Sequence, residues 1–290
     1  MTDAPAPTRL LTRPDGRTVA VDVAGPDDAP VVVFLHSSPG SRRFDPDPAV
    51  TASAAVRLVT LDRPGYGGSG PWPEGTVPTV AGCADDVAAA LDLLDAADAA
   101  VVGWSAGGRV AAGVAARHPD RVRALALVGT PSPADGSWIP PEHHAMLDPL
   151  RDDPASATAA LTAILAQVMG DDPEGALAAN TGDADAALLQ DPGVRSRVLA
   201  MHTEALRQGP VGIAADIVAD QVADWGYDPA SIGAPAHVFS SEDDFITPSH
   251  LAWWADTMVD TTVHTTSGVG HMLVVTEWAE VLAAVGHPVR

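Results

Sequence analysis

The chain has 290 residues, of which 46% are hydrophobic and 19% are charged, so a wholly disordered polypeptide is excluded and a sizeable core is expected. Its 16 basic and 38 acidic residues give a formal net charge of −22, and every basic residue is arginine. A surface this acidic repels phosphate backbones and anionic lipids, so we expect no nucleic-acid partner and no membrane partner. Two interpretations of the charge stay open: a GC-rich genome, which we favour, and adaptation to salt.

Cysteine content and the absence of long apolar stretches indicate the cellular compartment to expect. Cys83 is the only cysteine, so an intrachain disulfide is excluded. The first residues, MTDAPAPTRLLTRPDG, lack the basic and apolar regions of a signal peptide, and no run of about 18 apolar residues is present. We therefore expect a cytoplasmic protein.

The first half of the chain alternates between strand and helix patterns. In chain order the patterns predict strands at 8–12, 17–24, 31–35, 57–61, 99–103 and 123–128, and helices at 80–94 and 106–117. The runs VVVFL and RLVTL are short and rich in β-branched residues, which is typical of buried central strands. Such alternation predicts an α/β protein with a mostly parallel sheet and helices on both faces.

The alternation stops for about a hundred residues and then resumes. Between 131 and 229 we find helical stretches, acidic caps and prolines but no convincing strand. Strands at 236–240 and 262–266 then alternate with helices at 249–258 and 273–285. We therefore predict one α/β core domain, residues 1–130 and 231–290, interrupted by a helical cap at 131–230.

A serine lies at the junction between a buried strand and a helix of small residues. The segment Gly103-Trp104-Ser105-Ala106-Gly107 fits the pattern G-x-S-x-G, in which a sharp turn projects the serine hydroxyl above the carboxyl edge of a sheet. The glycines remove side chains that would clash there. The same turn also occurs where the serine merely caps the helix. In this strand–turn–helix context we favour a nucleophile.

A serine hydroxyl needs a base and an acid to become a nucleophile. In this architecture the acid and then the histidine follow the serine along the chain. Asp243 and Asp244 follow the strand predicted at 236–240, and His271 lies in a glycine-rich loop after the strand predicted at 262–266. Each of these residues alone would be an ordinary loop residue. Their order and their shared sheet edge predict a catalytic set.

At this point the chain resembles the α/β-hydrolase superfamily, in particular the branch with an H-G-x-P-G-S-R-like loop. The matching segments are His36-Ser37-Ser38-Pro39-Gly40-Ser41-Arg42, Asp62-Arg63-Pro64-Gly65-Tyr66-Gly67-Gly68-Ser69 and residues 103–108. The family's acid segment resembles G-x-x-D-x-x-x-P, and Pro248 therefore selects Asp244 over Asp243. The resemblance covers nearly the whole chain and is diffuse at 135–225, where the caps of the family diverge.

The resemblance implies an oxyanion hole made by the backbone N–H groups of Ala106 and Ser38. Ser37 and Ser241 stand where the family usually has glycine. A left-handed backbone at Ser37 would strain the oxyanion loop and disturb the Ser38 donor.

Other polar and aromatic residues near these motifs are candidates for contact with the substrate. We place His36, Ser37 and Trp104 beside the substrate, although a histidine that only orients the loop is an equally good interpretation of His36. His143 and His144 have no ligand partners at metal spacing, so we predict no metal site and no cofactor.

The resemblance implies a serine hydrolase that cleaves esters of small or medium acids. A lactonase, a C–C bond hydrolase, an aminopeptidase and a perhydrolase share the triad and stay open, although the H-G-G-P-G loop of proline iminopeptidases is absent. From another class, a small-molecule receptor on the same fold stays open too. The partner is a small molecule in each case, and monomer and homodimer both remain open.

Overall fold

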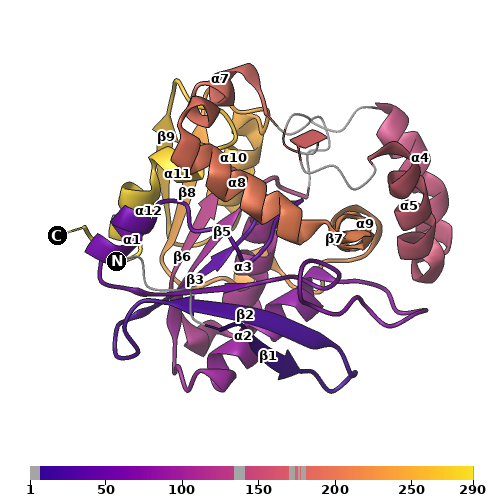
Figure 1. Ribbon diagram of the computed structural model, residues 1–290, viewed down its shortest axis with the longest axis horizontal. Helices are drawn as coiled ribbons and strands as arrows, with labels where there is room; N and C mark the ends of the chain where they lie inside the picture. Colours follow the sequence, from indigo (N-terminus) through magenta and orange to yellow (C-terminus); the bar gives the residue numbers. More distant parts are fainter. Residues whose placement is uncertain (1–6, 134–140, 170–173, 176, 178–180, 290) are drawn as a thin grey trace.

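An eight-stranded sheet runs through the computed structural model, which describes residues 7–133, 141–169, 174, 175, 177 and 181–289 (Figure 1). Six neighbouring strands, from β4 to β9 across the sheet, are parallel, and β1 and β2 add an antiparallel edge. The strands in spatial order are β1 (Arg9–Thr12), β2 (Thr18–Ala24), β4 (Arg57–Leu61), β3 (Val31–Leu35), β5 (Ala99–Trp104), β6 (Val122–Val128), β8 (Ala236–Ser241) and β9 (Thr261–Thr266). The predicted mostly parallel sheet is confirmed.

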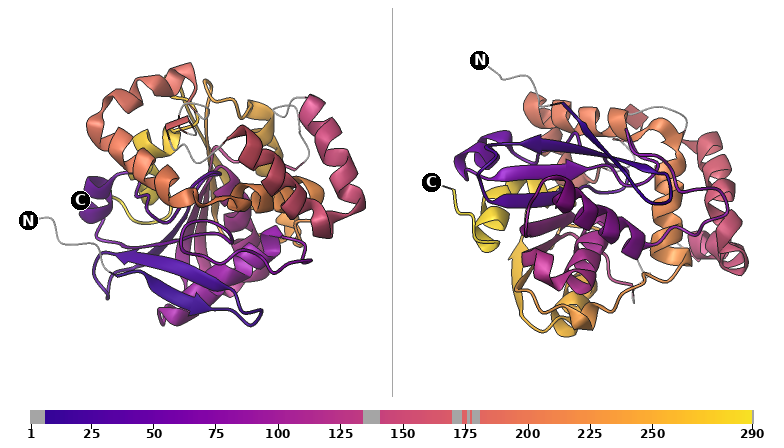
Figure 2. Two further views of the ribbon diagram at one scale, coloured as in Figure 1. Left: turned by 45° about the vertical axis from the view of Figure 1, so that its right-hand side comes forward. Right: turned by 90° about the horizontal axis from the view of Figure 1, so that it is seen from below.

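Helices cover both faces of the sheet, as Figure 2 shows. On one face lie α2 (Val80–Leu93), α3 (Ala106–Arg117) and α10 (Pro248–Thr257); on the other lie α1 (Pro48–Ser53), α11 (Leu273–Thr276) and α12 (Trp278–Ala284). Strand β3 explains the two layers, because Val31, Val33 and Leu35 join the first apolar cluster whereas Val32 and Phe34 join the second. A strand buried on both faces needs an unbroken apolar sequence, which VVVFL provides.

A helical insertion, defined here as residues 131–230, separates β6 from β8. Its described elements are α4 (Pro141–Asp152), α5 (Pro154–Val168), α7 (Asp183–Ala186), η2 (Leu188–Gln190), α8 (Pro192–Ala205), β7 (Arg207–Pro210), α9 (Val211–Ile217), the π-helical η3 (Val218–Val222) and η4 (Pro229–Ser231). The short strand β7, which the sequence did not predict, lies outside the central sheet. The insertion occupies the top and the right-hand side of Figure 1, over the edge of the sheet where the candidate site residues follow their strands.

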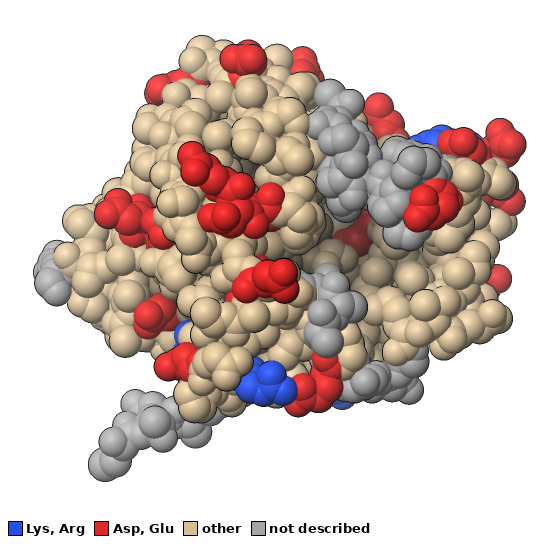
Figure 3. All heavy atoms as spheres, turned by 90° about the horizontal axis from the view of Figure 1, so that it is seen from above, with Lys and Arg blue, Asp and Glu red and all other residues tan. Residues whose placement is uncertain are grey.

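Among the charged side chains on the face of the molecule that carries the insertion, acidic ones predominate. Figure 3 looks onto this face and shows acidic side chains scattered over it, with few basic ones. An approaching anion therefore meets net negative charge on this side.

None of the helices in the described ranges is both long and apolar enough to cross a membrane.

Candidate active site

Ser105 occupies the turn between β5 and α3 in a strained backbone conformation. Its φ of 57° and ψ of −125° lie outside the regions that side chains other than glycine usually adopt. The turn is held by the backbone, since Ser105 N donates to the carbonyl of Val128 at 2.9 Å. It also requires glycine on both sides, because a Cβ at Gly103 would lie 2.4 Å from Gly107 O and one at Gly107 would lie 2.3 Å from Leu35 O.

Asp244 and His271 are joined by a buried hydrogen bond. Nδ1 of His271 lies 3.0 Å from Oδ1 and 3.1 Å from Oδ2 of Asp244, whose side chain is fully buried. Because an ionised carboxylate only accepts hydrogen bonds, the proton belongs on Nδ1, which leaves the lone pair of Nε2 for another partner. Asp243 makes a different contact: its Oδ2 accepts from the backbone N–H of Gly268 at 2.6 Å.

Ser105 and His271 line the same cavity. Among the hydrogen bonds of the described residues, the one between the serine hydroxyl and the imidazole ring is not formed. Such bonds are often long in ligand-free sites and shorten when substrate binds. The ring of Phe245 packs against His271 with its centroid 4.4 Å away, so the imidazole is confined on that side.

The Ser38 hydroxyl belongs to a buried polar network that crosses from the core to the insertion. Arg63 donates from Nε and Nη2 to the two carboxylate oxygens of Asp216 on α9, at 3.0 and 2.6 Å. The Tyr66 hydroxyl donates to Asp216 at 2.7 Å and lies 2.9 Å from Ser38 Oγ. Because the single hydroxyl proton of Tyr66 is donated in the hydrogen bond to Asp216, Ser38 is the donor in its hydrogen bond with Tyr66. Burial, reinforced by Asp216, raises the pKa of Tyr66 well above its usual value.

The loop before Ser38 is fixed by backbone and arginine contacts. Nη1 and Nη2 of Arg63 donate to the carbonyls of His36 and Ser37, and His36 Nδ1 lies 2.7 Å from the Ser37 carbonyl. Burial, helped by the Arg63 charge, lowers the pKa of His36 well below its usual value, so His36 is neutral. His36 does not line the cavity, which corrects its placement beside the substrate and leaves the loop-orienting interpretation.

Ser37 does not adopt the left-handed conformation that would strain the oxyanion loop. The described non-glycine residues with positive φ are Ala55, Asp95 and Ser105. The Ser37 hydroxyl donates to the Pro39 carbonyl at 3.2 Å and lines the cavity. The serine that replaces the family's glycine is therefore accommodated without backbone strain.

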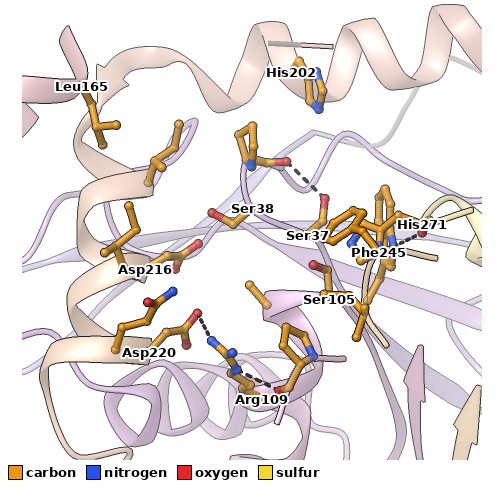
Figure 4. Close-up of a pocket in the computed structure, with 18 of the residues that line it drawn as sticks. Ser37, Ser38, Ser105, Arg109, Leu165, His202, Asp216, Asp220, Phe245 and His271 are labelled. Atoms are coloured by element: carbon orange, nitrogen blue, oxygen red, sulfur yellow. Dashed lines mark hydrogen bonds and ion pairs between the residues drawn. The ribbon is translucent and has the colours of Figure 1, made fainter. Parts of the chain in front are cut away.

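A cavity of about 450 Å³ lies between the sheet edge and the insertion (Figure 4). Its lining is largely apolar and includes Met146, Leu165, Ile213, Ile217, Phe245 and Ile246. Figure 4 shows Asp216 and Asp220 on the side opposite to Phe245 and His271. The cavity thus has His271 at one end and, across from it, a polar wall formed by Asp216 and Asp220.

The polar wall holds an ion pair between the core and the insertion. Arg109 Nη1 on α3 lies 2.6 Å from Asp220 Oδ2 on η3, and both side chains are mostly buried. Burial raises the pKa of Asp220 to about 6, although the Arg109 charge acts in the opposite direction. Asp220 therefore changes its charge near the lower end of the physiological pH range.

The structure brings most of the predicted site residues together. Ser37, Ser38, Trp104, Ala106 and the pair Ser105 and His271 line the cavity, while Asp244 lies behind His271. The side chains of His143 and His144 lie outside the described residues. In the described ranges, no group of three or more metal-ligating side chains converges.

Sequence reasoning missed the polar residues that support this site. Arg63 and Tyr66 did carry a signal, since both fall in the Asp62–Ser69 segment that resembles the family. Asp216 and Asp220 carried none, because they lie in the insertion, where no motif marks them.

Comparison with known proteins agrees with this architecture. Residues 30–277 match the sequence family described as alpha/beta hydrolase fold. A pimeloyl-acyl-carrier-protein methyl ester esterase of Neisseria meningitidis is 35% identical over 105 residues, covering 36% of this chain and 38% of that protein. A bifunctional esterase/perhydrolase of Acinetobacter calcoaceticus is 34% identical over 119 residues, covering 41% and 42%. The chain thus spans less than half the length of these curated relatives.

Solved structures resemble the chain over nearly its whole length. A hydrolase of Pseudomonas aeruginosa has a TM-score of 0.72 at 24% identity, covering 96% of this chain and 98% of that one. An enol-lactonase of Burkholderia xenovorans has a TM-score of 0.66 at 21% identity, covering 93% and 96%. At these identities the likeness concerns the fold.

Proposed function

Because this chain belongs to the alpha/beta hydrolase family, we propose that it is a serine hydrolase that cleaves esters of small or medium acids. Ser105 is the nucleophile, His271 the base and Asp244 the acid that orients the base. The observation that carries this proposal is the hydrogen bond of 3.0 Å between Asp244 and Nδ1 of His271, in a cavity that Ser105 also lines.

The proposed reaction proceeds in two steps. Nε2 of His271 takes the proton of the Ser105 hydroxyl as its oxygen attacks the ester carbonyl, and the resulting oxyanion accepts hydrogen bonds from the N–H groups of Ala106 and Ser38. His271 then protonates the departing alcohol. In the second step His271 deprotonates a water molecule as it attacks the acyl-enzyme carbonyl, and then returns that proton to Ser105 Oγ as the acid is released. All of these roles are filled by protein groups, so the proposal needs no metal and no cofactor.

The cavity supports the proposed substrate class. A volume of about 450 Å³ and a largely apolar lining suit an acyl chain of modest length. The name of the Neisseria meningitidis relative, a methyl ester esterase, supports ester chemistry, although the match covers 38% of that protein. We propose that the insertion is a cap that covers the acyl chain of the substrate and limits the length of that acyl chain.

Labelling with a fluorophosphonate probe tests the proposal. We expect the wild type and the control variant Ser231→Ala, whose exposed serine lies on η4, to be labelled, and Ser105→Ala to remain unlabelled although folded. A series of p-nitrophenyl esters of increasing acyl length, together with lactones and aminoacyl amides, then separates esterase from the other triad chemistries. A folded wild type that is neither labelled nor active would favour a small-molecule receptor.

A further inference from the structure

One acidic side chain of the insertion reaches beneath the loop that carries His271. Asp185, on α7, accepts hydrogen bonds at Oδ1 from the backbone N–H of Gly270 at 2.9 Å and of Met272 at 3.1 Å. Only 1% of Asp185 is exposed. The carboxylate therefore holds the peptide units Val269–Gly270 and His271–Met272, which bracket the proposed base.

The fit between Asp185 and this loop is tight. A Cβ at Gly270 would lie 2.7 Å from Oδ2 of Asp185, so the loop approaches the carboxylate as closely as glycine alone allows. Four residues further on, Leu189 joins the apolar cluster that contains Val269 and Met272. The insertion thus contacts the loop that carries His271 through hydrogen bonds and through apolar packing.

The consequence for His271 is geometric. Hydrogen bonds to an ionised carboxylate are stronger than those between neutral groups, and two of them converge here on one oxygen. They fix the Val269–Gly270 peptide plane, one residue before His271, and the His271–Met272 plane directly after its Cα, while the Asp244 carboxylate fixes the far end of the side chain at Nδ1. The direction of Nε2 toward Ser105 therefore depends on both carboxylates.

We propose that Asp185 is a positioning residue for the reaction, by which the insertion holds the base loop in its working geometry. The inference rests on the proposed function, since it assigns a role relative to His271 as base. It makes the insertion part of the catalytic apparatus as well as a cover for the substrate.

The test compares Asp185→Ala and Asp185→Asn with Asp183→Ala, an exposed acidic residue of the same short helix. We expect kcat on the best p-nitrophenyl ester to fall roughly 10- to 100-fold in Asp185→Ala while KM stays within about threefold, because a misplaced catalytic group slows chemistry more than binding. Asp185→Asn keeps an oxygen that accepts from both N–H groups, so we expect it to recover most of kcat. Asp183→Ala should match the wild type.

Hydrogen–deuterium exchange supplies a readout that needs no activity. We expect a peptide covering 268–274 to lose protection in Asp185→Ala and to keep it in Asp185→Asn. A folded Asp185→Ala variant with wild-type kcat would overturn the proposal, as would equal loss of kcat in the Ala and Asn variants. If the wild type cleaves no ester, the proposed function fails; unchanged protection in Asp185→Ala then overturns the hold on the loop, and lost protection supports it.

Discussion

The indole Nε1–H of Trp104 donates to the backbone carbonyl of His271 at 2.8 Å. The residue that precedes the proposed nucleophile in sequence thus holds the backbone of the proposed base, although 167 positions separate them. The two rings also lie 5.9 Å apart between centroids. Strand β5 and the loop after β9 are therefore coupled directly above the sheet edge.

Trp104→Phe tests this coupling. The substitution keeps an aromatic ring but leaves the buried His271 carbonyl without its donor and opens a small cavity, so we expect the free energy of unfolding to fall by about 1–3 kcal/mol. We expect kcat to fall several-fold. Trp253→Phe, which reduces a partly buried tryptophan on α10, is the matched control for urea unfolding and ester kinetics. Equal kinetics for the two variants would contradict the coupling.

Substitutions of the two neighbouring aspartates, Asp243 and Asp244, should differ sharply in their effect on kcat. Asp244→Asn replaces the carboxylate that accepts from His271 Nδ1 and favours the wrong tautomer, so we expect kcat to fall by about 10⁴-fold. Asp243→Asn alters only the contact with Gly268 and should lower kcat by less than about tenfold. Steady-state kinetics at pH 8 measure both, and a greater loss in Asp243→Asn would reverse the assignment.

The Arg109–Asp220 pair predicts a pH-dependent preference for charged acyl chains. Since the pKa of Asp220 is raised to about 6 by burial, with Asp216 adding to the shift and Arg109 and Arg63 opposing it, the carboxyl becomes neutral as pH falls through this value. Arg109 then lacks its counter-charge and attracts an anionic group on the substrate. For an ester whose acyl chain ends in a sulfonate, we expect KM to fall between pH 7.5 and 5.5.

Asp220→Asn provides the control for this pH effect. The variant mimics the neutral form, so its KM for the sulfonate ester should be low and nearly constant over the same range. An uncharged ester of equal length should show no such change in KM in either protein. A KM for the sulfonate ester that varies equally in the wild type and the variant would assign the effect to another group.

Gly107 should be among the least replaceable residues of the site. A Cβ there would lie 2.3 Å from Leu35 O and 2.6 Å from His36 O, and backbone atoms yield little. We expect Gly107→Ala to lower the free energy of unfolding by about 1–3 kcal/mol, because α3 must shift away from the oxyanion loop. Gly233→Ala, where a Cβ would meet no atom within 4 Å, should change it by less than about 0.5 kcal/mol in urea unfolding.

The central sheet was predictable because its signals are local. Runs such as VVVFL identify buried strands through composition alone, and G-x-S-x-G marks the turn at Ser105 through the glycines that its geometry requires. Strand β7 escaped prediction because Arg207–Pro210 contains a glycine and a proline and lies outside the sheet, so no alternating pattern reveals it.

The side chains that support the site from the insertion could not be predicted in the same way. Asp185 and Asp216 reach the loops at Gly270 and Tyr66 through contacts that span 85 and 150 positions, and an aspartate in a helical segment ordinarily indicates a solvated surface. His36 was ambiguous because a strand-end histidine can point to the substrate or into the loop. The ring contacts of His36 decide this, since Nδ1 lies 2.7 Å from the Ser37 carbonyl and Nε2 accepts from the backbone N–H of Arg63 at 3.4 Å.

The insertion contributes to the cavity in two ways, and helices α4 and α5 contribute in one of them. The carboxylates that reach the core loops come from α7 and α9, and α9 also lines the cavity with Ile213 and Ile217. Helices α4 and α5 supply apolar lining such as Met146 and Leu165 and none of these carboxylates. At the α4 and α5 positions, substrate preference can therefore change during evolution without altering the residues that support turnover. A combinatorial library restricted to the lining positions of α4 and α5 should yield enzymes with new chain-length profiles and an undamaged catalytic centre.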